Sequence, residues 1–206
     1  MRSRAALILR VGLVSFVALA AMTITSPVVR GAAQHVRWDI ISINFPPASP
    51  LTIIAGGHAA ALANDGSRIT LTGSGTFVAP GGGEGSNGST TGGGTWQTCN
   101  PALTVCVSGT YEVTGLVRWD PAPFPPGGPP PRTDLIDEGE ASTGLAVLRI
   151  EYSDGDHGIL VVSCTGATAD PREFEGITAS KGYVDYWNRV APVANVDANR
   201  TLFHVR

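Results

Sequence analysis

The chain has 206 residues, of which 43% are hydrophobic and only 15% are charged. This length suits one domain of ordinary size, and the hydrophobic content excludes a wholly disordered chain. The formal net charge is −3 and no basic patch is present, which argues against a nucleic-acid-binding protein.

The first 33 residues are typical of a removable signal peptide. Three arginines give a basic start before an apolar run at 11–22. Such a run suits a signal-peptide core and is shorter than the roughly 20 residues that a membrane span needs. Small residues permit cleavage after Ala20 or after Ala33, and we favour Ala33 because the first strand pattern begins soon after it. An uncleaved anchor is the alternative.

Cleavage after Ala33 leaves residues 34–206 as a single domain. Its net charge is −7, because four of the basic residues lie in the leader. A mildly acidic domain is a poor partner for nucleic acid or for an anionic membrane. We therefore expect a secreted or periplasmic protein, bacterial in its general appearance, with no transmembrane span after cleavage.

Residues 69–78 and 111–119 alternate between apolar and polar side chains, which predicts half-buried strands. In the second segment we expect Val113, Gly115 and Val117 on the apolar face. Glycines recur on the apolar faces of both segments. Glycine inside a strand pattern indicates bulges, bends or a close approach of another backbone.

Further strand patterns continue to the C-terminus. They lie at 36–43, 51–62, 94–99, 104–108, 144–152, 158–164, 174–186 and 201–205. About eight to ten strands joined by turn signals predict an all-β fold, as an antiparallel barrel or a β-sandwich. We favour a single barrel because strongly curved sheets use inward glycines. The alternative is the sandwich.

Two loops interrupt this pattern. Residues 80–95 contain eight glycines, and residues 121–131 contain seven prolines. The first composition predicts a mobile loop, and the second a stiff extended segment. Both are longer than ordinary hairpin connections, which points to a function or to disorder.

The three cysteines fit an exported protein. A turn-forming sequence separates Cys99 from Cys106, so we expect a disulfide across a hairpin. Cys164 is left over in a strand-like run, where a free buried thiol is favoured over pairing with another cysteine and over a catalytic thiol.

No motif for catalysis, metal or cofactor emerges, and we expect neither a cofactor nor a metal. Asp154 and Asp156 flank a glycine and predict a tight turn between two strands rather than a metal site. An acidic run follows the Pro-rich loop, where a solvated rim is favoured over acid–base chemistry. Its members are Asp134, Asp137, Glu138 and Glu140.

The tryptophans and one tyrosine are the remaining candidates for a site. Core packing is the simplest role for Trp38, Trp96, Trp119 and Trp187. Together with Tyr111 they would otherwise line the barrel mouth, where an apolar or sugar ligand stacks. The set that we single out as possible ligand-lining residues is Trp38, Trp96, Tyr111 and Trp119.

The sequence alone does not establish a function. We expect non-enzymatic binding of a small molecule or a partner surface. The first alternative is a barrel enzyme of isomerase or cyclase type with acids in its lumen, which rests on analogy of fold. The second is a structural or adhesive protein of the cell envelope. The oligomeric state stays open.

Overall fold

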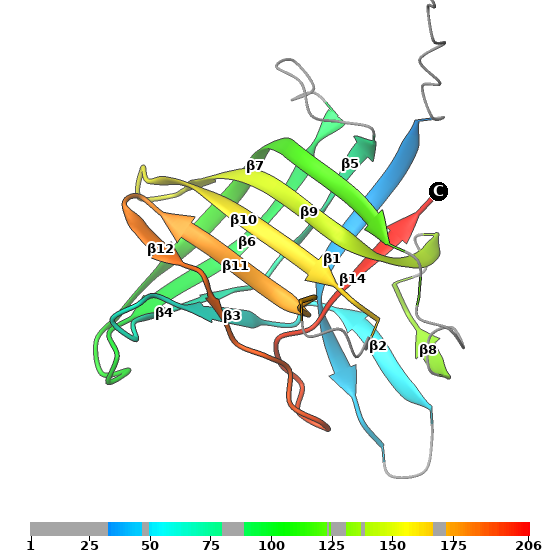
Figure 1. The fold of residues 1–206 in the computed structure, drawn as a ribbon, viewed down its shortest axis with the longest axis horizontal. Helices are drawn as coiled ribbons and strands as arrows, with labels where there is room; N and C mark the ends of the chain where they lie inside the picture. Colours follow the sequence, from blue (N-terminus) through cyan, green and yellow to red (C-terminus); the bar gives the residue numbers. More distant parts are fainter. Residues whose placement is uncertain are drawn as a thin grey trace, which may run out of the picture. The chain divides into compact units, whose positions relative to one another are not determined.

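Figure 1 shows the protein as a computed structural model, which describes residues 33–46, 50–79, 89–122, 124, 131–136, 139–166 and 172–206. The predicted signal peptide, apart from its last residue, lies outside the described residues. Most of the Gly-rich loop and most of the Pro-rich loop lie outside them as well. Strands account for 65% of the structure and helix for 1%. The predicted all-β class is confirmed.

Fourteen strands follow one another along the described chain. They are β1 (Gln34–Asn44), β2 (Leu51–Ala55), β3 (Ala59–Leu62), β4 (Arg68–Leu71), β5 (Ser74–Ala79), β6 (Thr91–Cys99), β7 (Cys106–Ala122), β8 (Arg132–Asp134), β9 (Glu140–Tyr152), β10 (His157–Cys164), β11 (Gly176–Lys181), β12 (Val184–Tyr186), β13 (Asn188–Arg189) and β14 (Thr201–Val205). The predicted strands at 51–62, 69–78 and 174–186 are each divided into two. β6 begins earlier than predicted, so residues 91–95 of the predicted Gly-rich loop belong to a strand.

Six of these strands close an antiparallel barrel, in the order β9, β14, β1, β5, β6, β7 and back to β9. The first and last strands of the domain lie side by side, with Val36 opposite Val205 and Ile40 opposite Thr201. The barrel prediction is confirmed. The ring has six strands rather than eight to ten, because the other strands extend the sheet outside the closed path.

The extensions continue from three strands of the ring. β10, β11 and β12 follow β9, while β4, β3 and β13 follow β6, and β2 with β8 lies against β1 (Figure 1). β2 and β8 pair in parallel, whereas the pairs of the ring are antiparallel. The short β13 joins β3 through Asn188 and Arg189, which carries the chain from β12 across to another part of the sheet.

β7 departs from simple alternation at two irregularities. Its register with β9 shifts between Val113 and Gly115, and again between Leu116 and Arg118. An extra residue in one strand turns the following side chains to the other face. Leu116 is therefore 2% exposed and Val117 is 38% exposed. This reverses the predicted alternation, which placed Val117 on the apolar face.

Aromatic side chains fill the barrel interior. Trp38 and Phe203 have no exposed surface, and Phe77 is 1% exposed. The Trp119 ring lies 5.4 Å from the Phe77 ring and 4.6 Å from the Phe203 ring, between ring centroids. Such tilted and edge-to-face contacts add to the stabilisation that burial provides. The interior is therefore a packed core.

Gly75 makes room for one of these indoles. It lies opposite Trp38 in the pairing of β1 with β5. A Cβ at this position would lie 2.8 Å from Trp38 Nε1 and closer still to the carbonyl oxygen of Thr91. Only a residue without Cβ fits there without displacing backbone, which supports the predicted role of inward glycines.

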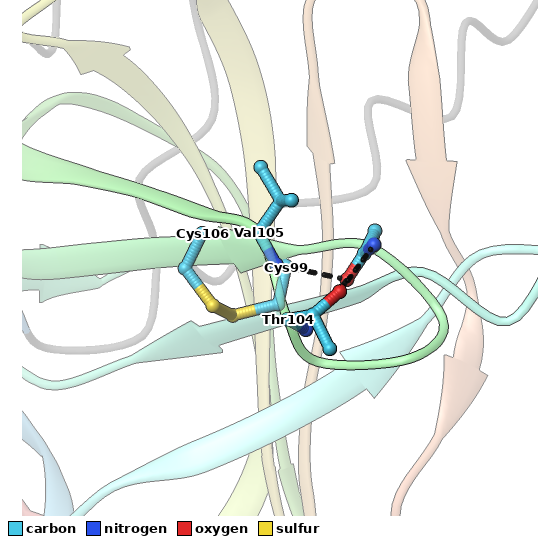
Figure 2. Close-up of a disulfide and its surroundings, with 5 residues drawn as sticks. Cys99, Thr104, Val105 and Cys106 are labelled. Carbon is cyan, nitrogen blue, oxygen red and sulfur yellow. Dashed lines mark hydrogen bonds between the residues drawn. A yellow bond between two sulfur atoms is a disulfide. The ribbon is translucent and has the colours of Figure 1, made fainter.

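A disulfide closes the tip of the hairpin that β6 and β7 form (Figure 2). Cys99 and Cys106 are joined with an S–S distance of 2.03 Å. In the loop, Asn100 Oδ1 accepts hydrogen bonds from the backbone N–H of Thr104 at 2.9 Å and of Val105 at 3.2 Å. The predicted disulfide is confirmed.

The predicted turn between β9 and β10 is also present, with Gly155 at φ 91°. The aspartates on either side of this glycine, Asp154 and Asp156, form ion pairs with the ammonium group of Lys181. Lys181 Nζ lies 2.6 Å from Asp154 Oδ2 and also bonds Asp156. The same ammonium group lies 4.6 Å from the centroid of the Trp96 ring. These carboxylates therefore bind a lysine of the chain itself.

Candidate ligand-binding groove

The outer face of β9 and β10 is apolar over part of its length. Leu148 and Val162 belong to the core with no exposed surface, so the adjacent Val147 and Val161 point to the other face. These two valines are paired across the strands and are partly exposed. An outward position on a barrel wall is ordinarily polar, as Arg149 is further along β9. Together the two valines form a small apolar patch on this wall.

This patch forms the floor of an open groove with a volume of about 610 Å³. The groove is lined by Leu145, Val147, Val161, Phe174, Thr178, Trp187, Asn188 and Arg189. Trp187 is 59% exposed. It lies between β12 and β13, on the segment that crosses from β11 towards β3. Its indole lines the groove together with the apolar floor and is largely open to solvent.

Polar groups at the groove are oriented by contacts within the chain. The Arg189 guanidinium donates a hydrogen bond to the Glu173 carbonyl oxygen at 2.8 Å and lies 5.5 Å from the centroid of the Phe174 ring. Asn188 Nδ2 donates to Asn64 Oδ1 at 3.2 Å. An apolar lining with a few positioned polar groups is the usual composition of a small-molecule site.

The four residues singled out from the sequence lie elsewhere. Trp38, Trp96 and Tyr111 are buried, with 0%, 3% and 2% of their surfaces exposed, and Trp119 is partly buried and packs against the core. Trp96 Nε1 donates to the Thr110 carbonyl oxygen at 3.0 Å. None of the four lines the groove, and their role in contacting a ligand stays a prediction.

Sequence reasoning counted Trp187 among the tryptophans but left it out of the ligand-lining set. Two features of the sequence belong to the groove, although neither identifies it alone. Leu145, Val147 and Val161 occupy positions where alternation requires polar residues, and Trp187 follows the last residue of a strand beside Asn188 and Arg189. The apolar outward positions have meaning only once the inward face of each strand is known.

The structure describes two of the four acidic candidates. Asp134 Oδ2 lies 3.1 Å from His204 Nε2, and Glu140 begins β9 in an exposed position. Asp137 and Glu138 lie outside the described residues. Among the residues that the structure describes, no group of three or more histidines, cysteines or acids is arranged to hold a metal ion.

Comparisons of the chain with protein-family models, with curated proteins and with solved structures found no match. Within the described residues, no helix combines the length and the apolar character that crossing a membrane requires.

Proposed function

We propose that the protein is a non-enzymatic binding protein that holds a small molecule in the groove on the outer face of β9, β10 and β11. The observation that carries this proposal is Trp187, 59% exposed above an apolar floor in a groove of about 610 Å³. Small-molecule sites typically have volumes of roughly 300 to 1,000 Å³ and a largely apolar lining.

The ligand is a ring with one apolar face, either a sugar or a planar hydrophobic molecule. Its apolar face stacks on the Trp187 indole and on Val147 and Val161. Its polar edge reaches Asn188 and Arg189, which already bond within the chain and are therefore held in position. Aromatic stacking with a polar rim suits both classes of ring, and a screen distinguishes them.

The positions of the buried acids favour binding over acid–base chemistry in the barrel lumen. Asp39 alternates with Trp38 and so lies on the outer face of β1, where Arg37 donates two hydrogen bonds to its carboxylate at 2.8 and 2.9 Å. Glu175 lies next to β11 and accepts hydrogen bonds from the backbone N–H groups of Thr165 and Thr201. Neither carboxylate enters the aromatic core.

Export through an N-terminal signal is part of the same proposal. It is supported by the basic and apolar leader and by the Cys99–Cys106 disulfide, because structural disulfides persist in oxidising compartments. Intact-mass analysis of protein recovered outside the cytoplasm tests it. We expect a chain that begins at Gln34, or at Ala21 if the earlier site is used. A full-length chain recovered only from the cytoplasm would contradict export.

A thermal-shift screen of sugars and planar hydrophobic compounds tests the binding proposal. A ligand at a hundred times its Kd should stabilise the protein by about 2.7 kcal/mol. Trp187→Ala should abolish the shift without changing the melting temperature of the free protein, because the side chain is exposed. Tyr183→Ala is the matched control, since Tyr183 is fully exposed and lines no part of the groove. Absence of any hit, or a shift that survives Trp187→Ala, would refute the proposal.

A further inference from the structure

A second and smaller cavity lies apart from the groove, beside β1, β2 and β8 and where β10 ends and β14 begins. Its volume is about 110 Å³. Most of its wall is apolar, from residues Ile41, Ile43, Phe45, Leu51, Ile53, Phe124 and Leu202. The remaining lining includes Arg132, Cys164, Glu175, Arg200 and Thr201. Three charged residues, Arg132, Glu175 and Arg200, therefore line a small cavity whose wall is otherwise mostly apolar.

Each of the two arginines lies over a phenylalanine of the wall. The Arg200 guanidinium is 5.4 Å from the centroid of the Phe45 ring, and the Arg132 guanidinium is 5.6 Å from that of Phe124. Guanidinium groups combine such ring contacts with planar, bidentate hydrogen bonding to carboxylates. The rings therefore hold both cations at the cavity.

Arg200 retains a buried donor that no described residue satisfies, and Arg132 makes only a loose ion pair with its nearest carboxylate. Arg200 donates from Nη2 to the Val193 carbonyl oxygen at 3.1 Å, while its buried Nε has no hydrogen-bond partner. Arg132 Nε lies 4.0 Å from Asp134 Oδ2, beyond hydrogen-bonding distance. That oxygen is instead 3.1 Å from His204 Nε2. A buried donor without an acceptor is costly, so an acceptor in the cavity would be bound favourably.

The one acid of the lining is already engaged by the backbone. Glu175 accepts hydrogen bonds from the N–H of Thr165 at 2.9 Å and of Thr201 at 2.8 Å. Burial raises the pKa of this carboxyl group, although these backbone bonds and the nearby Arg200 act in the opposite direction. The lining itself carries two arginines and one acid, and a second acid, Asp134, lies 4.0 Å from Arg132, so the guanidinium donors rather than a net charge favour an anion here.

We propose that this cavity binds a small aliphatic carboxylate, with its charged end at Arg132 and Arg200 and its carbon chain against Ile43, Phe45 and Ile53. A water molecule takes about 30 Å³ of the liquid, and a dry cavity of about 150 Å³ holds a benzene molecule. On the same scale a cavity of about 110 Å³ holds about four non-hydrogen atoms, which are the carboxylate and the first carbon of such an acid, and further methyl groups would lie against the apolar rim. This site is independent of the groove, and its failure would leave the proposed function untouched.

Titration of the purified protein with sodium isobutyrate tests the proposal, followed by calorimetry and by amide chemical shifts. The neutral isostere isobutyramide is the matched ligand. We expect isobutyrate to bind with shifts at the Thr165 and Thr201 amides, and isobutyramide to bind at least about tenfold more weakly. Arg200→Gln and Arg132→Gln should each weaken isobutyrate binding by about tenfold or more. Arg118→Gln, an exposed arginine with 66% of its side chain accessible, should leave it unchanged.

Thermal unfolding shows whether each arginine variant is folded. If one of them does not fold, the other still tests the proposal. Equal binding of the acid and the amide would show an apolar cavity without anion recognition and would overturn the proposal. Binding that is unaffected by both arginine substitutions, or no binding at millimolar isobutyrate, would overturn it as well.

Discussion

Substituting Gly75 by alanine perturbs the packing of the barrel at a single defined point. The added Cβ would meet the Thr91 carbonyl oxygen, the Gly92 Cα atom and, at 2.8 Å, Trp38 Nε1. Backbone atoms cannot rotate away as a flexible side chain does. Overpacking of a core costs typically 1 to 3 kcal/mol, and we expect Gly75→Ala to cost about 3 kcal/mol. For a domain of this size the melting temperature should fall by about 6 to 12 °C.

Urea unfolding followed by tryptophan fluorescence measures this loss, with Gly155→Ala as the control. Gly155 has φ 91° and nothing within 4 Å of its added Cβ, so its substitution costs only the left-handed backbone conformation, about 1 to 2 kcal/mol. If Gly75→Ala proves no more destabilising than Gly155→Ala, Trp38 does not pack against this strand pair as described.

Three further predictions concern the disulfide and the titratable groups. Replacing Cys99 and Cys106 by alanine should lower the free energy of unfolding by about 2.5 kcal/mol, as expected for a short closed loop, and urea unfolding checks it. The hydrogen bond from Lys181 lowers the pKa of Asp154 in the folded state; this stabilisation is present above pH ~3.9 and is lost as pH falls through the lowered pKa. The stability difference between wild type and Lys181→Met, measured by urea unfolding across acid pH, should therefore shrink below about pH 4. Burial raises the pKa of Tyr111 far above its ordinary value, so stability should fall as pH rises beyond about 10, and its phenolate absorbance should appear only with unfolding.

Much of the fold follows from local pattern. Alternation at 69–78 predicted the buried face correctly but predicted one strand where the structure has two, β4 and β5, while the turn at Gly155 predicted a real hairpin. The in–out period of a strand is recorded directly in side-chain polarity, whereas the break between two strands is not. The sequence did not predict that Leu116 is buried and Val117 exposed. A bulge moves the residues that follow it to the other face until a second bulge restores the alternation, and the positions of both bulges depend on the register with β9, which is a long-range property.

The groove was harder to predict than the barrel. Trp187 resembles any core tryptophan in the sequence, and its exposure depends on the chain crossing from β12 to β13. Val147 and Val161 look like ordinary strand residues until the core face is assigned to their neighbours. The second cavity is lined by Arg132 and Arg200, which are distant in the sequence. No local spacing of residues therefore indicated this cavity.

Collisional quenching of tryptophan fluorescence by iodide tests whether the barrel interior is packed and the apolar groove lies on its outer face. Of the four tryptophans, Trp187 is 59% exposed whereas Trp38 and Trp96 are 0% and 3% exposed. We predict that Trp187→Phe removes most of the quenchable emission of the folded protein. Trp119 is partly buried and should contribute little to the quenching. Quenching that persists at the wild-type level in the Trp187→Phe variant would show that Trp187 is not the main accessible tryptophan and would contradict its placement in an open groove.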